Sequence, residues 1–240
     1  MNWLYLAINL GSIAVPLAFS FEKRARFYKS WPSLFPALLI TALVFIVWDV
    51  WFTSIGIWRF NPEYISGISL PNLPVEEWMF FLFIPYSCVF IHESLKQLLP
   101  GSPMKNYGKP IAILLGICSI AIGLINLQHM YTAVTFLAIG TFLLFTVRFS
   151  SPQFMGRFFL TYLVSLIPFT VVNGILTGMP VLIYNANENI GIRIGTIPLE
   201  DFFYSMLMLL MNITIFEYLQ TKRNSTDAAK RAPATAPDLK

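Results

Sequence analysis

The stretch "PNLPVEEWMF", residues 71–80, opens a long apolar run with two adjacent carboxylates, Glu76 and Glu77. The stretch "GTIPLEDFFY", residues 195–204, repeats the order of residue types: a proline, an aliphatic residue, two acids and an aromatic residue, again where an apolar run begins. The recurrence has two explanations. Either both stretches only start helices in the same way, or the chain has built one functional site twice.

The composition around these stretches indicates an integral membrane protein. The 240 residues are 56% hydrophobic and only 12% charged, whereas a soluble domain has about 25% charged residues. Cys88 and Cys118 lie inside apolar runs and are interpreted as packing thiols, with neither metal spacing nor a disulfide framework. The net charge of +4 does not indicate nucleic-acid binding, because the basic residues gather at helix ends and in the tail.

Seven stretches are long enough to cross a bilayer, which takes about 20 apolar residues per helix. They cover approximately residues 3–20, 34–52, 76–98, 110–127, 131–147, 158–177 and 199–220. Basic residues follow the first span instead of preceding it, which favours a retained helix over a cleaved signal peptide.

Lysine and arginine follow the first, third, fifth and seventh spans, whereas the opposite side has only Arg59 and Arg193. The positive-inside rule therefore predicts an outside N-terminus and a cytoplasmic C-terminus in a multi-pass protein of the cell membrane, here the bacterial inner membrane. The polar residues 222–240 are expected to form a disordered cytoplasmic tail.

The chain repeats itself at a shift of 124 residues, which places Ile57 on Val181 without a gap. The shift aligns Pro74 with Pro198 and the acid pair of residues 76–77 with that of residues 200–201. We predict an all-α membrane fold with a first repeat over residues 1–109, a connecting helix over 110–128 and a second repeat over 129–221. Since the shift spans four helices, both copies cross in the same sense, as parallel repeats about an axis along the membrane normal.

The four acids Glu76, Glu77, Glu200 and Asp201 are the candidate catalytic residues. Helix capping is the alternative, because carboxylates stabilise helix N-termini. Capping needs one acid per helix, and the duplicated pair favours a functional role. Adjacent helical residues point about 100° apart, so which member of each pair faces a cavity stays open. Clustered carboxyl groups near a membrane are not all ionised, because desolvation and mutual repulsion disfavour the charged form, so at least one can donate a proton.

Other polar and aromatic residues gather near the acids. Asp49 is an intramembrane acid between two tryptophans, and its counterpart Asn173 keeps the hydrogen bonding without the charge. Arg193 is present in the second copy alone and either neutralises a carboxylate or faces water. Aromatic faces stabilise a cation by about 0.5–2 kcal/mol each. The residues expected to contact a substrate are Trp48, Asp49, Trp51, Trp78, Phe80, Asn173, Arg193, Phe202 and Tyr204.

Several signatures are missing from the sequence. It has no dinucleotide-binding G-x-G-x-x-G, no P-loop, no His/Cys metal cluster and no hydrolase elbow. The seventh span has no lysine for a retinal Schiff base, and no aspartate-rich magnesium motif is present. We therefore expect neither a cofactor nor a metal.

"PNLPVEEWMFF", "GTIPLEDFFY" and "WDVWFTSIGIW" together resemble the small integral-membrane lycopene cyclases, the non-flavoprotein type found as two half-size subunits or as one fused chain. The resemblance covers residues 1–220 and suggests the fused, stand-alone form. It implies that Glu76, Glu77, Glu200 and Asp201 are the catalytic acids and that lycopene is the substrate. It also implies membrane lipids, and other enzymes of carotenoid biosynthesis, as partners.

The implied reaction is an isomerisation. An acid protonates the terminal C1=C2 alkene of a ψ-end, the C5=C6 alkene attacks the resulting cation, and loss of a proton leaves a β-ring. Two alternatives are a carotenoid hydratase of similar fold, in which water captures the same cation, and a seven-helix protein that binds or transports a ligand without changing it.

Overall fold

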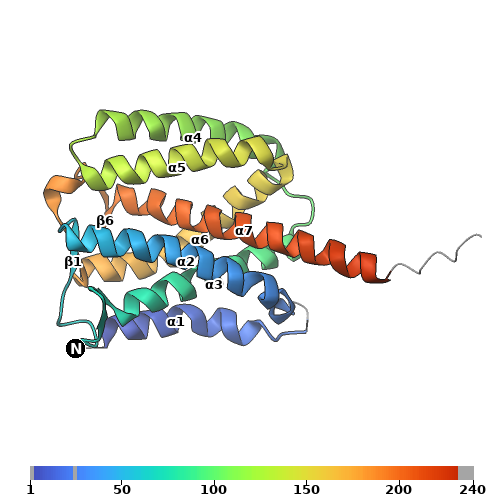
Figure 1. Cartoon of the computed structure of the whole chain (residues 1–240), viewed down its shortest axis with the longest axis horizontal. Coiled ribbons are helices and arrows are strands. Elements are labelled where there is room, and N and C mark those ends of the chain that lie inside the picture. Colours follow the sequence, from blue (N-terminus) through green and yellow to red (C-terminus); the bar gives the residue numbers. More distant parts are fainter. Residues whose placement is uncertain (1–2, 24–25, 232–240) are drawn as a thin grey trace, which may run out of the picture.

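The computed structural model describes residues 3–23 and 26–231, and over these residues the fold is built from seven helices (Figure 1). Six are long and apolar enough to cross a bilayer, whereas α1 has 16 residues and is shorter. The expectation of an all-α membrane protein is therefore confirmed. The helices are α1 (Leu4–Phe19), α2 (Trp31–Ser54), α3 (Val75–Leu98), α4 (Lys105–Ile125), α5 (Met130–Phe149), α6 (Pro152–Gly178) and α7 (Leu199–Arg231).

The last helix is longer than the sequence analysis expected. A disordered tail was predicted from residue 222, but α7 continues to Arg231. Within this extension Arg223 and Asp227 form an i,i+4 ion pair at 4.0 Å, and the hydroxyls of Ser225 and Thr226 donate to the carbonyl of Lys222. The chain is helical up to Arg231, so the expectation of disorder is wrong up to that residue. Residues 232–240 lie outside the described part of the chain.

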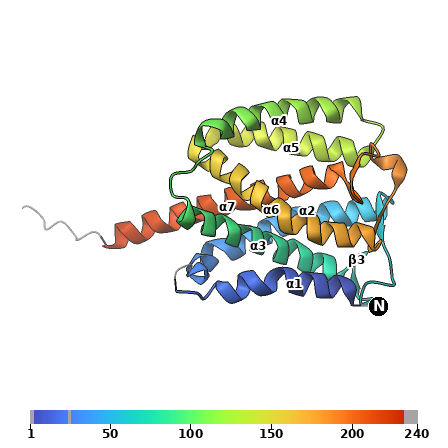
Figure 2. The ribbon, with the colours of Figure 1, turned by 180° about the vertical axis from the view of Figure 1, so that it is seen from behind.

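The helices pack in matched pairs. α1 packs on α3 and α5 packs on α7, while α2 packs on α7 and α6 packs on α3 (Figures 1 and 2). The element α4 packs on α5 and α6 at one side of the bundle. At the contact of α4 with α6, a Cβ on Gly108 would lie 2.4 Å from the backbone nitrogen of Gly156. Glycine at both positions therefore allows the two backbones to meet, as small residues do in membrane bundles.

A β-hairpin precedes each helix that begins with two acids. In the first copy β2 (Ser69–Leu70) pairs with β3 (Leu73–Pro74), and in the second β5 (Arg193–Ile194) pairs with β6 (Ile197–Pro198). The registers match at the 124-residue shift, since Ser69 faces Pro74 and Arg193 faces Pro198. The proline ends each hairpin in an extended conformation and the helix begins at the next residue, which puts the acids in its first turn.

A third strand pair joins the two halves of the chain. β1 (Trp58–Phe60) runs antiparallel to β4 (Leu182–Tyr184), with Arg59 opposite its own counterpart, Ile183. Beyond the ladder, the backbone N–H of Asn61 donates to the carbonyl of Val181 at 2.9 Å, and the backbone N–H of Asn185 donates to the carbonyl of Ile57 at 2.8 Å. Each bond is the counterpart of the other at the 124-residue shift. Neither these strands nor the short 3₁₀ helices Phe27–Ser30 and Ala186–Glu188 were expected from the sequence.

Candidate active site

A buried cavity of about 60 Å³ lies beside the first turns of α3 and α7 and is lined by acids from both halves of the chain. Asp49 of α2, Glu77 of α3 and Asp201 of α7 all face it, and each is no more than 6% exposed. Four tyrosines, Tyr5, Tyr131, Tyr184 and Tyr204, add their hydroxyls to the polar lining, as do Asn173 and Ser205. This cavity is called the acid chamber below.

Asp201 is the most heavily hydrogen-bonded acid of the chamber. The Tyr131 hydroxyl donates to its Oδ1 at 2.5 Å, while the Tyr184 hydroxyl and the Asn173 amide donate to its Oδ2 at 2.7 and 2.9 Å. An ionised carboxylate is an acceptor only, and three donors stabilise that form. Of the three acids that line the chamber, Asp201 therefore has the most support for its ionised form.

Glu77, the counterpart of Asp201 in the first copy, has a different environment. The Tyr5 hydroxyl donates to its Oε2 in a short hydrogen bond. Asp49 accepts a single hydrogen bond of 3.2 Å from the Tyr204 hydroxyl. With fewer donors, these carboxyl groups have less support for the charged form in a buried site. The chamber thus combines one well-stabilised carboxylate with two others suited to exchanging protons.

Glu76 and Glu200 do not line the chamber, so the member of each acid pair that faces it, left open by the sequence, is Glu77 in the first copy and Asp201 in the second. Glu76 and Glu200 are completely buried, and each binds its own copy's loop: Glu76 Oε1 accepts from the Ser66 amide at 2.7 Å, and Glu200 Oε1 accepts from the Ile190 amide at 3.0 Å. Glu200 Oε1 also accepts from the Thr132 hydroxyl at 2.5 Å. Because neighbouring helical residues point about 100° apart, one member of each pair holds the loop and the other faces the chamber.

The residues expected to contact a substrate divide into two groups. Asp49, Phe80, Asn173 and Tyr204 line the chamber. Trp48 lies behind Tyr204, with ring centroids 5.3 Å apart. The other five, Trp48, Trp51, Trp78, Arg193 and Phe202, do not line the chamber, and their contact with a substrate stays a prediction.

Local contacts explain the position of those that face elsewhere. Trp51 is 44% exposed on the outer face of α2. The Trp78 indole donates to the Leu70 carbonyl at 2.7 Å and so fastens the first hairpin to α3. Arg193 is exposed and donates to the Thr196 carbonyl at 2.7 Å within the second hairpin. The Phe202 ring packs against Phe169 with centroids 5.1 Å apart.

Three tyrosines of the chamber were missed by the sequence analysis. Tyr5 and Tyr131 lie on α1 and α5, which the ungapped 124-residue alignment places out of register, because it pairs Tyr5 with His129. A two-residue adjustment in those helices would have matched the two tyrosines. Tyr184 has Phe60 as its counterpart, so the repeat carries no signal for its hydroxyl.

Tyr184 lies outside the helices, at the end of β4. Burial and the adjacent Asp201 carboxylate raise the pKa of its phenol well above the usual value of 10.0. Tyr184 therefore stays neutral, as a hydrogen-bond donor to Asp201, throughout the physiological pH range.

Aromatic rings surround the acids. Trp58 packs edge-on against Tyr131 with centroids 5.2 Å apart, and Tyr131 stacks on Tyr184 at 5.8 Å. Trp58 and Tyr204 meet at 6.4 Å. A carbocation formed in the chamber would be surrounded by aromatic rings and would face carboxylates.

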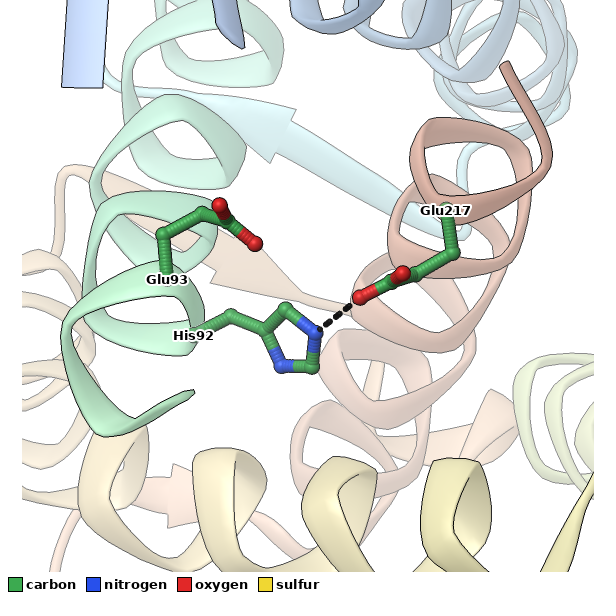
Figure 3. A group of neighbouring side chains, drawn as sticks. All are labelled: His92, Glu93 and Glu217. Carbon is green, nitrogen blue, oxygen red and sulfur yellow. Dashed lines mark hydrogen bonds and ion pairs between the residues drawn. The ribbon is translucent and has the colours of Figure 1, made fainter. Parts of the chain in front are cut away.

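A second acidic cluster lies near the other end of α3 and α7. His92, Glu93 and Glu217 could geometrically hold a metal ion (Figure 3). His92 Nε2 is 2.8 Å from Glu217 Oε1, its Nδ1 is 2.8 Å from the Thr161 hydroxyl, and Lys96 pairs with both Glu93, at 2.6 Å, and Glu217. The Lys96 ammonium already supplies the positive charge that the two carboxylates require, so the cluster is interpreted as a structural ion-pair network.

Replacing Glu217 with glutamine is expected to lower stability and leave the chamber intact. The change removes the charge that Lys96 and His92 face, and loss of a buried charged partner costs about 1–3 kcal/mol. The measurements are the midpoint of thermal unfolding in detergent and the amount, per folded protein, of the β-ring product that the resemblance implies. Product loss at an unchanged midpoint would contradict the structural interpretation.

The comparisons with known proteins agree with the resemblance noted in the sequence. A family model described as lycopene cyclase matches residues 2–95 and 128–219, which are most of the chain and include both acid pairs. No curated protein and no solved structure matches the chain. The two matched segments are separated by residues that include α4.

Proposed function

The chain belongs to the lycopene cyclase family, and from this premise we propose that it closes the ψ-ends of lycopene into β-rings by a redox-neutral, acid-catalysed cyclisation. The single observation that supports this reaction best is the acid chamber, in which Glu77, Asp201 and Asp49 face one buried, ring-lined cavity. The reaction needs an acid, a base and a negative charge opposite a cation, and the chamber offers carboxyl groups for these roles.

Glu77 is the proposed proton donor. It transfers its proton to C2 of the terminal alkene, which leaves a tertiary cation at C1. The π electrons of the C5=C6 bond then form the C1–C6 bond and shift the cation to C5. Glu77 suits this step because Tyr5 donates the one hydrogen bond described at its carboxyl group, so that group is less committed to the ionised form than Asp201 is.

Asp201 is the proposed counter-charge, and the proposed base is the Glu77 carboxylate that the first step leaves. Asp201 stays ionised through three donated hydrogen bonds and stabilises the cation electrostatically. The Glu77 carboxylate removes the proton from C6 as the C5=C6 double bond of the β-ring forms. This proton restores the starting state of Glu77, so the substrate and product have the same atoms and no electron carrier is consumed.

The proposed catalytic set differs from that of the sequence analysis. Glu76 and Glu200 now have a positioning role, in which each carboxyl group holds the loop before its hairpin against its helix. Their neighbours in sequence, Glu77 and Asp201, are presented to the chamber as a result.

The reaction is tested by expressing the chain in a bacterial host that accumulates lycopene and extracting the pigments. The proposal expects β-ring carotenoids. Hydroxylated acyclic carotenoids would indicate the hydratase, and unchanged lycopene in the presence of folded, membrane-inserted protein would indicate a binding or transport protein.

The matched contacts of the two halves support parallel repeats and seven spans. The paired hairpins and the loop hydrogen bonds of Glu76 and Glu200 recur at the 124-residue shift, and the ladder of β1 with β4 is symmetric about the pair Arg59 and Ile183. We propose that α1–α3 and α5–α7 are two repeats, related by an axis along the membrane normal and joined by α4. The acid chamber then lies toward the outer surface and the basic ends of the helices lie in the cytoplasm.

The orientation predicts the location of the C-terminus. A green fluorescent protein fused after residue 240 is expected to be fluorescent, and a periplasmic alkaline phosphatase fused at the same place is expected to be inactive. Fluorescence and phosphatase activity are compared at equal expression in the inner membrane. Active phosphatase with a dark fluorescent fusion would reverse the proposed orientation.

A further inference from the structure

An apolar groove between α3 and α6 extends from the acid chamber toward the middle of the bundle. Its volume is about 90 Å³, and residues of α1 and α7 also line it. Small and apolar side chains line it, and its edge includes Pro168, which is exposed on the outer surface of α6. Among its lining residues are Ile84, Ser87 and Cys88 of α3, Ser165 and Phe169 of α6, and Met208 of α7.

The groove and the acid chamber are continuous. Phe80, Ile84, Phe169, Asn173, Ser205 and Met208 line both cavities. Along α3 the groove extends from Phe80 to Ile91, which at 1.5 Å per residue is about 16 Å, or roughly half of the bilayer core. A linear hydrocarbon with one end among the acids would therefore lie along this groove, with its remaining length in the membrane.

The equivalent position in the other half of the chain, between α2 and α7, is filled by side chains. The counterparts of α3 and α6 are α7 and α2, which pack on each other across the bundle. There Phe45, the counterpart of Phe169, is only 1% exposed and packs edge-on against Tyr204 with centroids 5.0 Å apart. Trp48 stacks on Phe45 at 5.8 Å, where the groove has the smaller Val172. Large rings thus occupy the space that is open between α3 and α6.

The groove between α3 and α6 also differs in polarity from the equivalent position between α2 and α7. Cys88 of the groove has Asn212 as its counterpart, and the Asn212 side chain is completely buried with neither amide atom hydrogen-bonded. A hydrocarbon cannot satisfy this amide, and an unsatisfied buried polar group costs about 1–3 kcal/mol. The groove between α3 and α6 is the place that suits a polyene.

We propose that this groove is the binding site for the polyene chain of the substrate and that the enzyme holds one end of one carotenoid at a time, always from the α3–α6 side. The inference rests on the proposed cyclase function. A substrate with two ψ-ends must then leave the groove and return in the opposite direction before its second end reaches Glu77 and Asp201.

The experiment measures bound lycopene, so that it does not depend on ring formation. A Glu77→Gln parent variant is purified from a lycopene-accumulating host, and the ratio of lycopene to protein is determined from absorbance. Adding Cys88→Phe is expected to lower this ratio by about tenfold, because an inserted ring in a packed site costs about 1–3 kcal/mol.

Cys118 supplies the matched control. It is exposed on α4, away from the groove, so Cys118→Phe places the same ring on the outside of the bundle and should not change bound lycopene. Ser165→Leu narrows the groove from the α6 wall and should lower bound lycopene even where Cys88→Phe fails to fold. Equal lycopene in the parent and in folded Cys88→Phe or Ser165→Leu would overturn the inference, as would a parent that retains no lycopene.

The same variants in the unsubstituted background separate the two proposals. If the chain forms β-rings and Cys88→Phe does not reduce their amount, the proposed binding site is wrong and the proposed cyclase function is supported. If Cys88→Phe lowers the amount of bound lycopene but the chain forms no rings, the binding site is supported and the cyclase function is wrong.

Discussion

Glu77→Gln should abolish most ring formation and leave a folded protein that still holds lycopene. The amide keeps an oxygen that can accept from the Tyr5 hydroxyl, so the local geometry has no reason to change. An amide is not an acid, however, and loss of a general acid lowers rates by about 10²–10⁴-fold. The measurement is β-ring product per folded protein in lycopene-accumulating cells.

The adjacent acid is the matched control for this variant. Glu76→Gln changes the neighbouring side chain in the same way, but Glu76 faces the Ser66 amide instead of the chamber. The amide oxygen can still accept that hydrogen bond, so Glu76→Gln should keep ring formation per folded protein within a few-fold of the starting chain, with at most a lower unfolding midpoint. Equal losses in the two variants, or full activity with Glu77→Gln, would remove Glu77 as the donor.

Much of the fold could be predicted from the sequence because membrane helices have a strong signal. The spans follow from runs of apolar residues, and the repeat follows from motifs such as Pro74 and Pro198, each before two acids. The strands gave no such signal, since β1 and β4 form a ladder only because the two halves meet. The end of α7 was misplaced because its polar last turns looked like a tail, although they are helical up to Arg231.

The site was predictable as a region but not as a set of residues. The two acid pairs marked the place, yet the rotation of α3 and α7 decided that Glu77 and Asp201 face the chamber while Glu76 and Glu200 face loops. That rotation depends on packing between helices distant in sequence. The tyrosine hydroxyls were missed for a related reason, since Tyr184 reaches Asp201 across a strand that the sequence did not reveal.

Asp201→Asn is expected to cause the second large loss of ring formation, about 10²–10³-fold, which is the usual effect of removing an electrostatic group from a transition state. The asparagine has no charge to oppose the cation. It also turns one acceptor into a donor, so an amide hydrogen would face the Asn173 amide or a tyrosine hydroxyl that now donates to the carboxylate. Ring formation per folded protein measures the loss, and bound lycopene shows whether the substrate still enters.

Two further variants separate charge from shape at this position. Asp201→Glu retains the charge and introduces the residue type that the first copy has at the equivalent position, Glu77. It should therefore retain more ring formation than Asp201→Asn. Tyr184→Phe removes one of three donors without removing the carboxylate, and a single hydrogen bond to a charged group contributes about 1.5–3 kcal/mol, so the loss should be smaller than that of Asp201→Asn. If Asp201→Glu and Asp201→Asn lost equal activity while both still bound lycopene, the shape of the side chain would matter and its charge would not, and Asp201 could not be the counter-charge of the cation.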